Sequence, residues 1–387
     1  MLRSFSVGSM RRVFKWLVRL MINTSYMNFA VGPVPSEFTV KSIGACDVPY
    51  FRTPEFSQMM LENESMLCEI AHAPKGSRAV FITGSGTSAM EATVMGLLDK
   101  DDHALVVDGG SFGHRFRQML ELHGIPHDAI ELLPGSALTR QDLAQFESGH
   151  YTAFLVNLGE TSQGILYDAE LIADFCKRND LFLIVDAISS FLADPFDMNE
   201  MGAGVMITDA QKALACPPGV APVVLSPAAV ERAFRIPAPC MYFDFKMMLK
   251  DGERGQTPFT PAVSILMQIH ERLCRIIKAG GAAAEIKRCN LIASDFRRRV
   301  SSLPFKMRMT SPSNAVTYLE TGSRSAKRLF EILKDEYGIW ICPNGGKQGD
   351  HSFRVGHIGA HGVSDNAVLV AAMNDVLDRG LLDMMEQ

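Results

Sequence analysis

The sequence lacks the cysteine and histidine spacings that mark a disulfide framework or a common metal site. Its eight cysteines form no CxxC pair, and its ten histidines form no HExxH motif. Scattered cysteines of this kind are typical of reduced thiols in a cytosol-like compartment. We therefore expect a cytoplasmic protein that binds no metal.

An excess of positive charge is also missing. The chain has 38 Lys and Arg against 43 Asp and Glu, a net charge of -5, which offers no general attraction for nucleic acid. No internal repeat and no low-complexity tract interrupts it. With 387 residues, of which 47% are hydrophobic and 21% charged, it can bury a large core and form two domains. These properties favour chemistry on small molecules.

The amino-terminal segment, residues 1–26, differs from the rest of the chain. It carries five basic residues and no acidic one, and Arg19 interrupts its apolar stretch. The segment is too short and too interrupted to span a bilayer, so we expect no transmembrane segment. A targeting peptide or a membrane-surface helix would have this composition. A disordered extension that results from an upstream start codon would have it too, and we favour this second interpretation.

Short apolar runs alternate with helical patterns through the first two thirds of the chain. The runs are rich in branched residues, as expected of buried strands: Ala79–Thr83, Ala104–Asp108, Ala129–Leu133, Ala153–Leu158, Leu181–Ala187, Gly204–Thr208 and Pro222–Ser226. Stretches such as Ala169–Arg178 have helical spacing. This alternation predicts an α/β fold with a mainly parallel seven-stranded sheet covered by helices on both faces. Ligands then belong at the carboxyl ends of the strands.

A second, smaller α+β domain is predicted after a long helical pattern that runs from Phe259 to Gly281. Beyond it, four further apolar segments alternate with helices, at residues 303–309, 314–320, 338–343 and 352–359. We predict a large domain over residues 27–265, a connecting helix over 266–281 and a small domain over 282–387.

The stretch "FITGSGTSAMEA", residues 81–92, predicts a strand, a glycine turn and an Ala-rich helix. Its glycines allow the backbone to approach an anion, and the start of the helix supplies free N–H groups. The stretch is therefore a candidate phosphate cradle, although it matches neither GxGxxG nor a Walker loop. A simple turn before a helix is the alternative.

Two ionisable residues follow neighbouring predicted strands. Lys212, in "ITDAQKALACPPG", has small and apolar neighbours, which indicates a desolvated and nucleophilic amine. A lysine with a packed stem and a solvated head is the alternative. Asp186 ends the apolar strand of "LFLIVDAISS", where a buried carboxylate needs a cationic or hydrogen-bonding partner. It could instead cap the following turn.

A lysine, a carboxylate and a phosphate cradle at one sheet edge suit a particular small molecule. A phosphate-bearing aromatic aldehyde with a ring nitrogen would link to the lysine, pair its nitrogen with the carboxylate and place its phosphate in the cradle. The molecule with these groups is pyridoxal 5'-phosphate, which we predict as the cofactor.

At this point the chain resembles a known family, the class V aminotransferases of the fold type I pyridoxal-phosphate enzymes. It is most similar to the group of alanine-glyoxylate, serine-pyruvate and 2-aminoethylphosphonate-pyruvate aminotransferases. The matching motifs, in order, are "MNFAVGPVP" (27–35), "TGSGTSAMEA" (83–92), "GGSFGHRF" (109–116), "GETSQG" (159–164), "VDAISS" (185–190), "AQKALACPPG" (210–219), "QTPFTPAV" (256–263) and "FRVGHIG" (353–359).

The resemblance implies a role for each matching residue. Lys212 would carry the cofactor and shuttle the substrate proton, while Asp186 would keep the ring nitrogen protonated. The remaining cofactor contacts would come from Ser85, Gly86, Thr87, Phe112, Thr161 and Gln211, and from Gln256 and Thr260 of a neighbouring subunit. The last two contacts imply a homodimer with shared active sites. Phe112 could instead be a core aromatic.

The substrate side is less clearly defined by the resemblance. Arg354 would bind the substrate carboxylate through two parallel hydrogen bonds, and Arg52 is a second candidate anion contact, with solvated arginines as the alternative. Family members often have a histidine where this chain has Leu158 and a threonine where it has Gln163. These departures put the substrate side of that loop in doubt.

The predicted activity is transfer of an amino group from a small amine or amino acid donor to a 2-oxo acid, pyruvate or glyoxylate. We lead with 2-aminoethylphosphonate and pyruvate, and keep alanine-glyoxylate or serine-pyruvate transfer as the alternative. A class V lyase or desulfurase is less favoured, because those enzymes usually carry a histidine where this chain has Gln211 and also use a mobile-loop cysteine. A non-catalytic binding protein is least favoured, because Lys212 and Asp186 are both present.

Overall fold

The computed structural model describes residues 26–147, 149–345 and 349–382. Apart from Tyr26, the extension predicted for residues 1–26 lies outside the described residues. None of the described helices combines the length and the apolar character needed to cross a bilayer.

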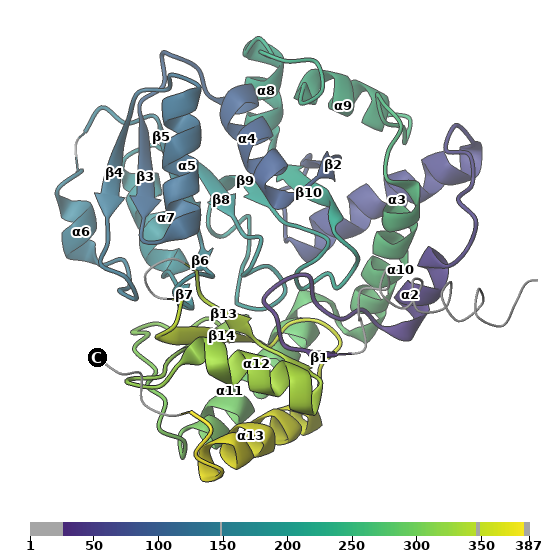
Figure 1. Ribbon diagram of the computed structural model, residues 1–387. Coiled ribbons are helices and arrows are strands. Elements are labelled where there is room, and N and C mark those ends of the chain that lie inside the picture. Colours follow the sequence, from purple (N-terminus) through teal and green to yellow (C-terminus); the bar gives the residue numbers. More distant parts are fainter. Residues whose placement is uncertain (1–25, 148, 346–348, 383–387) are drawn as a thin grey trace, which may run out of the picture.

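A seven-stranded sheet forms the centre of the larger part (Figure 1). Its order is β2-β10-β9-β8-β5-β3-β4. The strands are β2 (Arg78–Gly84), β3 (Ala104–Asp108), β4 (His127–Glu131), β5 (Ala153–Asn157), β8 (Phe182–Asp186), β9 (Ala203–Ile207) and β10 (Gly219–Leu225). All seven predicted strands are present, so the predicted α/β fold is confirmed. Strands β9, β8, β5, β3 and β4 are parallel, whereas β10 runs antiparallel to both of its neighbours, β2 and β9.

Helices cover both faces of this sheet, because successive strand side chains point to opposite sides and both sets are apolar. On one face, Val107 and Phe154 pack in the same core cluster as Phe175. On the other face, Val106 packs in the same cluster as Phe116. The helices of the first face are α3 (Pro54–Ile70), α7 (Ala169–Arg178) and α10 (Val263–Ala279); those of the second are α4 (Gly86–Leu97), α5 (Ser111–Leu122), α8 (Pro227–Arg235) and α9 (Phe245–Gly252).

Short elements complete the larger part. Helix α2 (Phe38–Gly44) packs on α10, and α6 (Arg140–Ala144) precedes β5. Strands β6 (Gly159–Glu160) and β7 (Ile165–Leu166) form an antiparallel pair that follows β5. The long helix predicted over 259–281 begins only at Val263, and Gly280 ends it in the left-handed region at φ 112°. A glycine adopts this conformation without steric cost.

The smaller part lies below the large sheet in Figure 1 and holds a three-stranded antiparallel sheet. The sheet order is β11 (Val316–Glu320), β14 (Ser352–Gly356), β13 (Cys342–Pro343), and the surrounding helices are α11 (Gly281–Val300), α12 (Ala326–Tyr337) and α13 (Val363–Asp378). The apolar segment at 303–309 forms no named strand. It contributes only an isolated antiparallel bridge between Lys306 and Glu320.

The start of the described chain belongs to the smaller part. Strand β1 (Met27–Asn28) pairs in parallel with β12 (Ile339–Trp340), and Phe29 is fully buried in the core of the smaller part. The sequence prediction assigned these residues to the large domain. They belong to the smaller part instead, because the backbone N–H groups of Met27 and Phe29 donate to the carbonyl oxygens of Gly338 and Trp340.

Candidate active site

The predicted site residues of the larger part lie at the carboxyl ends of its strands. Asp186 ends β8, Lys212 lies in the loop between β9 and β10, and the Ser85–Thr87 turn follows β2. Strand β10 brings the last two together, because its first residue, Gly219, pairs with Gly84 at the end of β2. The lysine loop and the glycine turn are therefore neighbours.

Lys212 is buried, with 8% of its surface exposed. Its ammonium nitrogen donates to the carbonyl oxygen of Val31 at 2.6 Å. The next residue, Gly32, has φ 137°, and a Cβ there would lie 3.0–3.1 Å from the lysine side chain. The pKa of Lys212 is lowered to about 8, chiefly by burial and also by the charge of Arg354, while Asp209 and Asp186 act against the shift. The amine is therefore closer to its nucleophilic form than a solvated lysine.

Asp186 is also buried, and its carboxylate accepts a hydrogen bond from the backbone N–H of Ile188 at 2.8 Å. Its pKa is raised to about 7, chiefly by burial and also by the charge of Glu160, while Lys212 and Arg115 act in the opposite direction. A carboxyl group with this pKa can share a proton with a basic ring nitrogen placed against it.

The glycine turn forms the amino terminus of α4. Ser85 is the cap residue, and its side chain makes no capping hydrogen bond. A Cβ at Gly86 would lie 2.5 Å from the terminal methyl of Ile188, so a side chain there would have to displace the end of Ile188. A helix start that its own cap side chain leaves open, with a glycine at close approach, is suited to bind a phosphate. We call residues 84–87 the phosphate cradle.

Asp209 contacts this cradle, a contact that the sequence analysis missed. Its Oδ2 atom accepts from the N–H of Gly86 at 2.9 Å and from the side-chain amide of Gln211 at 3.1 Å. Its other oxygen, Oδ1, is buried without a hydrogen-bond partner among the described residues. Burial raises the pKa of Asp209. The available signal was its position two residues after a buried strand, close to the strand-end position of Asp186.

The amino terminus of α5 contributes two further residues beside the cradle. The Arg115 guanidinium donates to the hydroxyl of Thr87 at 2.9 Å, and its carbon lies 4.9 Å from the centre of the Phe112 ring. Arg115 thus places a positive charge next to the predicted phosphate ligand. The sequence analysis missed this arginine, although it lies in the quoted motif "GGSFGHRF".

Glu160 holds this end of α5, and it too was missed. The side chain is fully buried. One oxygen accepts from the N–H groups of Phe112 (3.1 Å) and Gly113 (3.2 Å) and from the amide of Asn157 (2.8 Å). The other oxygen accepts from the N–H and the hydroxyl of Ser162. A carboxylate at a helix start is favourable for both hydrogen bonding and the helix dipole. Glu160 therefore fixes the position of Phe112.

Arg354 enters the site from the smaller part. Its guanidinium donates to the carbonyl of Thr161 at 3.3 Å and to the sulfur of Cys342 at 3.4 Å, and its Nε atom is buried without a hydrogen-bond partner among the described residues. Its charge lowers the pKa of Lys212, so the two cations lie close enough to interact. The Thr161 hydroxyl is buried and forms a hydrogen bond with Ser189.

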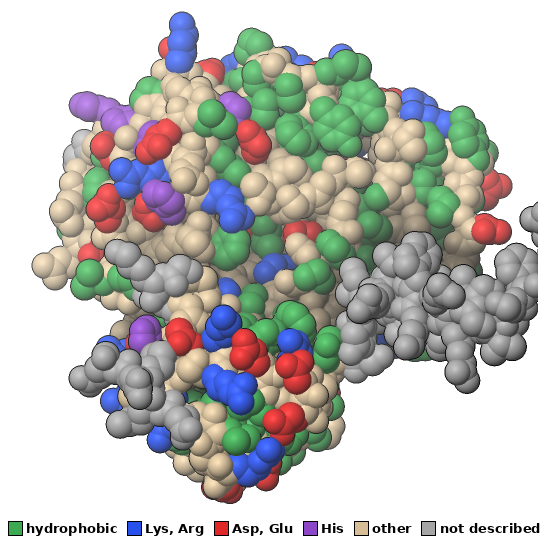
Figure 2. All heavy atoms as spheres, viewed as in Figure 1, with side chains coloured by type: hydrophobic (Ala, Val, Ile, Leu, Met, Phe, Trp, Pro, Cys, Tyr) green, Lys and Arg blue, Asp and Glu red, His purple; other side chains and the backbone are tan. Residues whose placement is uncertain are grey.

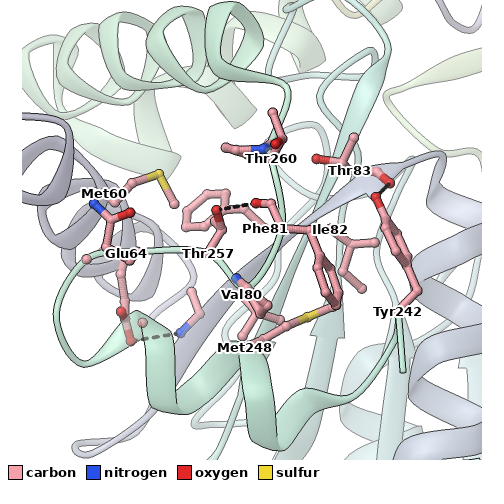
Figure 3. Close-up of a pocket in the computed structure, with 17 residues that line it drawn as sticks. Met60, Glu64, Val80, Phe81, Ile82, Thr83, Tyr242, Met248, Thr257 and Thr260 are labelled. Carbon is pink, nitrogen blue, oxygen red and sulfur yellow. Dashed lines mark hydrogen bonds between the residues drawn. The ribbon is translucent and has the colours of Figure 1, made fainter. Parts of the chain in front are cut away.

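Three predicted site residues lie elsewhere in the subunit. Arg52 donates to the Gln256 side chain at 2.9 Å and to the Thr257 carbonyl at 2.8 Å, and Gln256 donates to Ser57 at 2.6 Å. Gln256 and Thr260 line a small pocket of about 50 Å³ beside β2, shown in Figure 3. Within the described part of the chain, no hydrogen bond joins these three side chains to Lys212 or the cradle.

Leu158, one of the two departures, is fully buried, and its N–H donates to the backbone oxygen of Asp186 at 2.9 Å. Its side chain joins the core and is not available to a substrate. Gln163 lies in the turn between β6 and β7 and is half-buried. Across the described ranges, no group of three or more His, Cys, Asp and Glu side chains could hold a metal ion.

Comparison with known proteins defines the class. The fold matches pyridoxal-phosphate enzymes of fold type I: an alanine–glyoxylate aminotransferase structure from Nostoc sp. superimposes with a TM-score of 0.85 at 22% identity, over 93% of this chain and 98% of that one. The sequence model described as Aminotransferase class-V matches residues 50–242. The chain belongs to the class V aminotransferase family, and it is a transaminase that depends on pyridoxal phosphate.

Relatives with higher sequence identity than the Nostoc structure have names that differ from one another. A protein named soluble hydrogenase, small subunit, from Synechococcus sp. is 29% identical over 355 residues, which cover 89% of this chain and 91% of that protein. A 2-aminoethylphosphonate–pyruvate transaminase from Klebsiella pneumoniae is 26% identical over 92% of this chain and 99% of that protein. This chain therefore spans nearly the whole length of both relatives.

The residues at the sheet edge fit the cofactor. The backbone at Gly86 is closely approached by the side chains of Ile188 and Asp209, Lys212 has a lowered pKa, and Asp186 is a buried carboxyl group. When bound, pyridoxal phosphate supplies an aldehyde carbon and an electron-withdrawing ring. The protein in turn provides an amine that can take and return a proton, a carboxyl that can hold one, and an arginine that can orient an anion.

Proposed function

We propose that this aminotransferase moves the amino group of 2-aminoethylphosphonate to pyruvate. The position of Arg354 is the observation that carries the acceptor side of the proposal. The charge of its guanidinium lowers the pKa of Lys212, and its Nε atom has no hydrogen-bond partner among the described residues, so a planar carboxylate can bind it. The similarity to the Klebsiella 2-aminoethylphosphonate–pyruvate transaminase, over nearly the full length of both chains, supports the choice of donor.

Alanine-glyoxylate or serine-pyruvate transfer is the second candidate. The placement of Arg52 favours it, because Arg52 is bound to Gln256 and Thr257 of its own subunit and is not beside Arg354. An amino acid donor needs only one carboxylate contact, which Arg354 supplies in both half-reactions. A phosphonate donor has no carboxylate, and its anion is one carbon farther from the amine.

In this proposal the site residues divide the work as follows. Lys212 carries the cofactor and transfers the substrate proton, and Asp186 keeps the ring nitrogen protonated. The phosphate contacts are Ser85, Gly86, Thr87 and Gln211, while Phe112 covers the ring and Thr161 lies near its hydroxyl. The domain boundaries predicted at residues 265 and 281 and a cytoplasmic location belong to the same proposal.

A homodimer is also part of the proposal. Figure 2 shows apolar side chains gathered on the upper face near α8 and α9, where Phe234, Met241 and Tyr242 are exposed. Tyr242 also borders the pocket that contains Gln256 and Thr260. A second subunit seated on this face would bury these side chains and carry the Gln256–Thr260 loop toward its neighbour. Light scattering of the purified protein tests this directly, and a monomer at micromolar concentration would contradict it.

A panel of donors and acceptors tests the activity. The donors 2-aminoethylphosphonate, alanine and serine are mixed singly with the enzyme, and the cofactor absorbance is followed without an acceptor. We expect 2-aminoethylphosphonate to convert the cofactor to its amine form, and pyruvate to restore it, with ping-pong kinetics. If only alanine or serine converts the cofactor, the second candidate is correct. Release of ammonia without an acceptor would instead identify a lyase.

A further inference from the structure

Asp209 and a cofactor phosphate would use the same hydrogen-bond donors. The Oδ2 atom of Asp209 accepts from the Gly86 N–H at 2.9 Å and from the Gln211 amide at 3.1 Å. Both donors are among those that the proposed function assigns to the phosphate. A Cβ at Gly86 would lie 3.0 Å from Oδ2, so the carboxylate is in direct contact with the floor of the cradle.

If Asp209 only capped the start of α4, this would account for the hydrogen bonds of Oδ2 but not for the burial of Oδ1. Asp209 is 2% exposed, and Oδ1 is buried with no hydrogen-bond partner in the described part of the chain. An unpartnered buried carboxylate oxygen is unfavourable. Lys212 supplies an opposite charge that acts on Asp209, and in the proposed function that lysine belongs to the reaction centre. The free oxygen indicates that a further group completes this site.

Two negative groups cannot share the Gly86 N–H without repulsion. A phosphate oxygen at hydrogen-bond distance from that nitrogen would lie within a few ångströms of Oδ2, where like charges repel strongly in a buried site. The phosphate must therefore either displace the Asp209 side chain or meet it in its protonated form. In the protonated form Asp209 donates its O–H to a phosphate oxygen, and burial, which raises its pKa, makes this protonation easier.

We propose that Asp209 is an intramolecular anion that occupies the phosphate cradle and lowers the affinity of the enzyme for its cofactor. This inference rests on the proposed function, in which the cradle holds the cofactor phosphate. Asp209 acts on the phosphate end alone, so it decreases the preference of the protein for pyridoxal phosphate over pyridoxal, which has no phosphate. The enzyme then exchanges its cofactor more readily than one with a neutral residue at this position.

The test compares binding of the two molecules to the cofactor-free protein. Dissociation constants for pyridoxal phosphate and for pyridoxal are measured by absorbance titration for the natural protein, Asp209→Asn and Asp209→Gly. The first variant removes the charge and keeps the shape, whereas the second also empties the space. The measured quantity is the dissociation constant of pyridoxal divided by that of pyridoxal phosphate. We expect this ratio to rise about tenfold or more in both variants, since one buried like-charge contact is removed.

The control is Asp174→Asn, which removes the same charge from an exposed position on α7 and should leave the ratio unchanged. An unchanged or decreased ratio in both Asp209 variants overturns the inference, because Asp209 would then support the phosphate. Thr87→Ala separates this outcome from failure of the proposed function. If Thr87→Ala weakens binding of pyridoxal phosphate and not of pyridoxal, the cradle stands. If it affects neither molecule, the cradle assignment fails, and the inference fails with it.

Discussion

Replacing Glu160 with glutamine should destabilise the protein far more than its small change in size suggests. Its two oxygens accept five hydrogen bonds, three on one oxygen and two on the other. A glutamine can keep the oxygen that faces Phe112, Gly113 and Asn157, but its NH2 group then points at the N–H of Ser162. At least one hydrogen bond to a charged group is lost, and two buried donors face each other.

The expected cost follows from these contacts. A hydrogen bond to a charged group contributes roughly 1.5–3 kcal/mol, and an unsatisfied buried donor costs about 1–3 kcal/mol more. We therefore expect Glu160→Gln to lower the free energy of unfolding by about 3 kcal/mol, a large share of the roughly 5–15 kcal/mol of a typical domain. Urea denaturation of the cofactor-free protein, followed by circular dichroism, measures this difference.

The matched control is Glu121→Gln on the same helix. Glu121 is exposed and pairs with Arg117 at 3.3 Å, so its loss should cost less than about 1 kcal/mol. Hydrogen exchange supplies a local readout, because the amides of Phe112 and Gly113 should exchange faster in Glu160→Gln and not in the control. Equal unfolding free energies for the two variants would refute the role given to Glu160.

Four further predictions concern the reaction centre. Lys212→Ala should bind pyridoxal phosphate only non-covalently and lose transamination; borohydride reduction and peptide mapping of the natural protein should place the label on Lys212, and a label on another lysine would refute the assignment. Asp186→Asn should keep the cofactor but lower turnover by several orders of magnitude, and unchanged turnover would make Asp186 structural. In the cofactor-free protein, folded Asp186 has a pKa of about 7 against 3.8 for the ordinary group, so this residue makes the folded state less stable as pH rises from about 4 to about 7; urea titrations across this range should show a flatter decline for Asp186→Asn. Arg354→Lys should raise the Michaelis constant for the oxo acid about tenfold to a hundredfold, since one charge-assisted bond of roughly 1.5–3 kcal/mol is lost; an unchanged constant would place the carboxylate contact elsewhere.

Much of the larger part could be predicted from local patterns. Its seven strands are short runs rich in branched apolar residues, and the runs in the middle of the sheet are buried, whereas the edge strand β4 is only partly so. The direction of β10 was not predicted. The connection from Ile207 to Gly219 is too short to hold the helix that a parallel crossover needs, so its length carried the information.

The sequence placed Asp186 at the end of one strand and Lys212 in the loop after the next, as the structure has them, and their catalytic roles stay predictions. Contacts between distant loops were not predictable in this way. Asp209 and Gly86 are 123 residues apart, and Glu160 and Phe112 are 48 apart. No local sequence pattern predicts contacts at such separations, because each contact depends on the order of the strands in the sheet. Arg52 shows the converse case, since a plausible anion contact is bound to a loop of its own subunit.

The antiparallel strand β10 also has a consequence for the order in which the chain becomes functional. It pairs with β2 on one side and with β9 on the other, and it alone joins the cradle to the lysine loop within the sheet. Contacts between segments so far apart in sequence form late, because a long loop must close first. A chain emerging from the ribosome therefore cannot bind its cofactor while β10 is still missing, even though every catalytic group of the larger part has already been synthesised. Binding of the cofactor therefore indicates that the central sheet is complete.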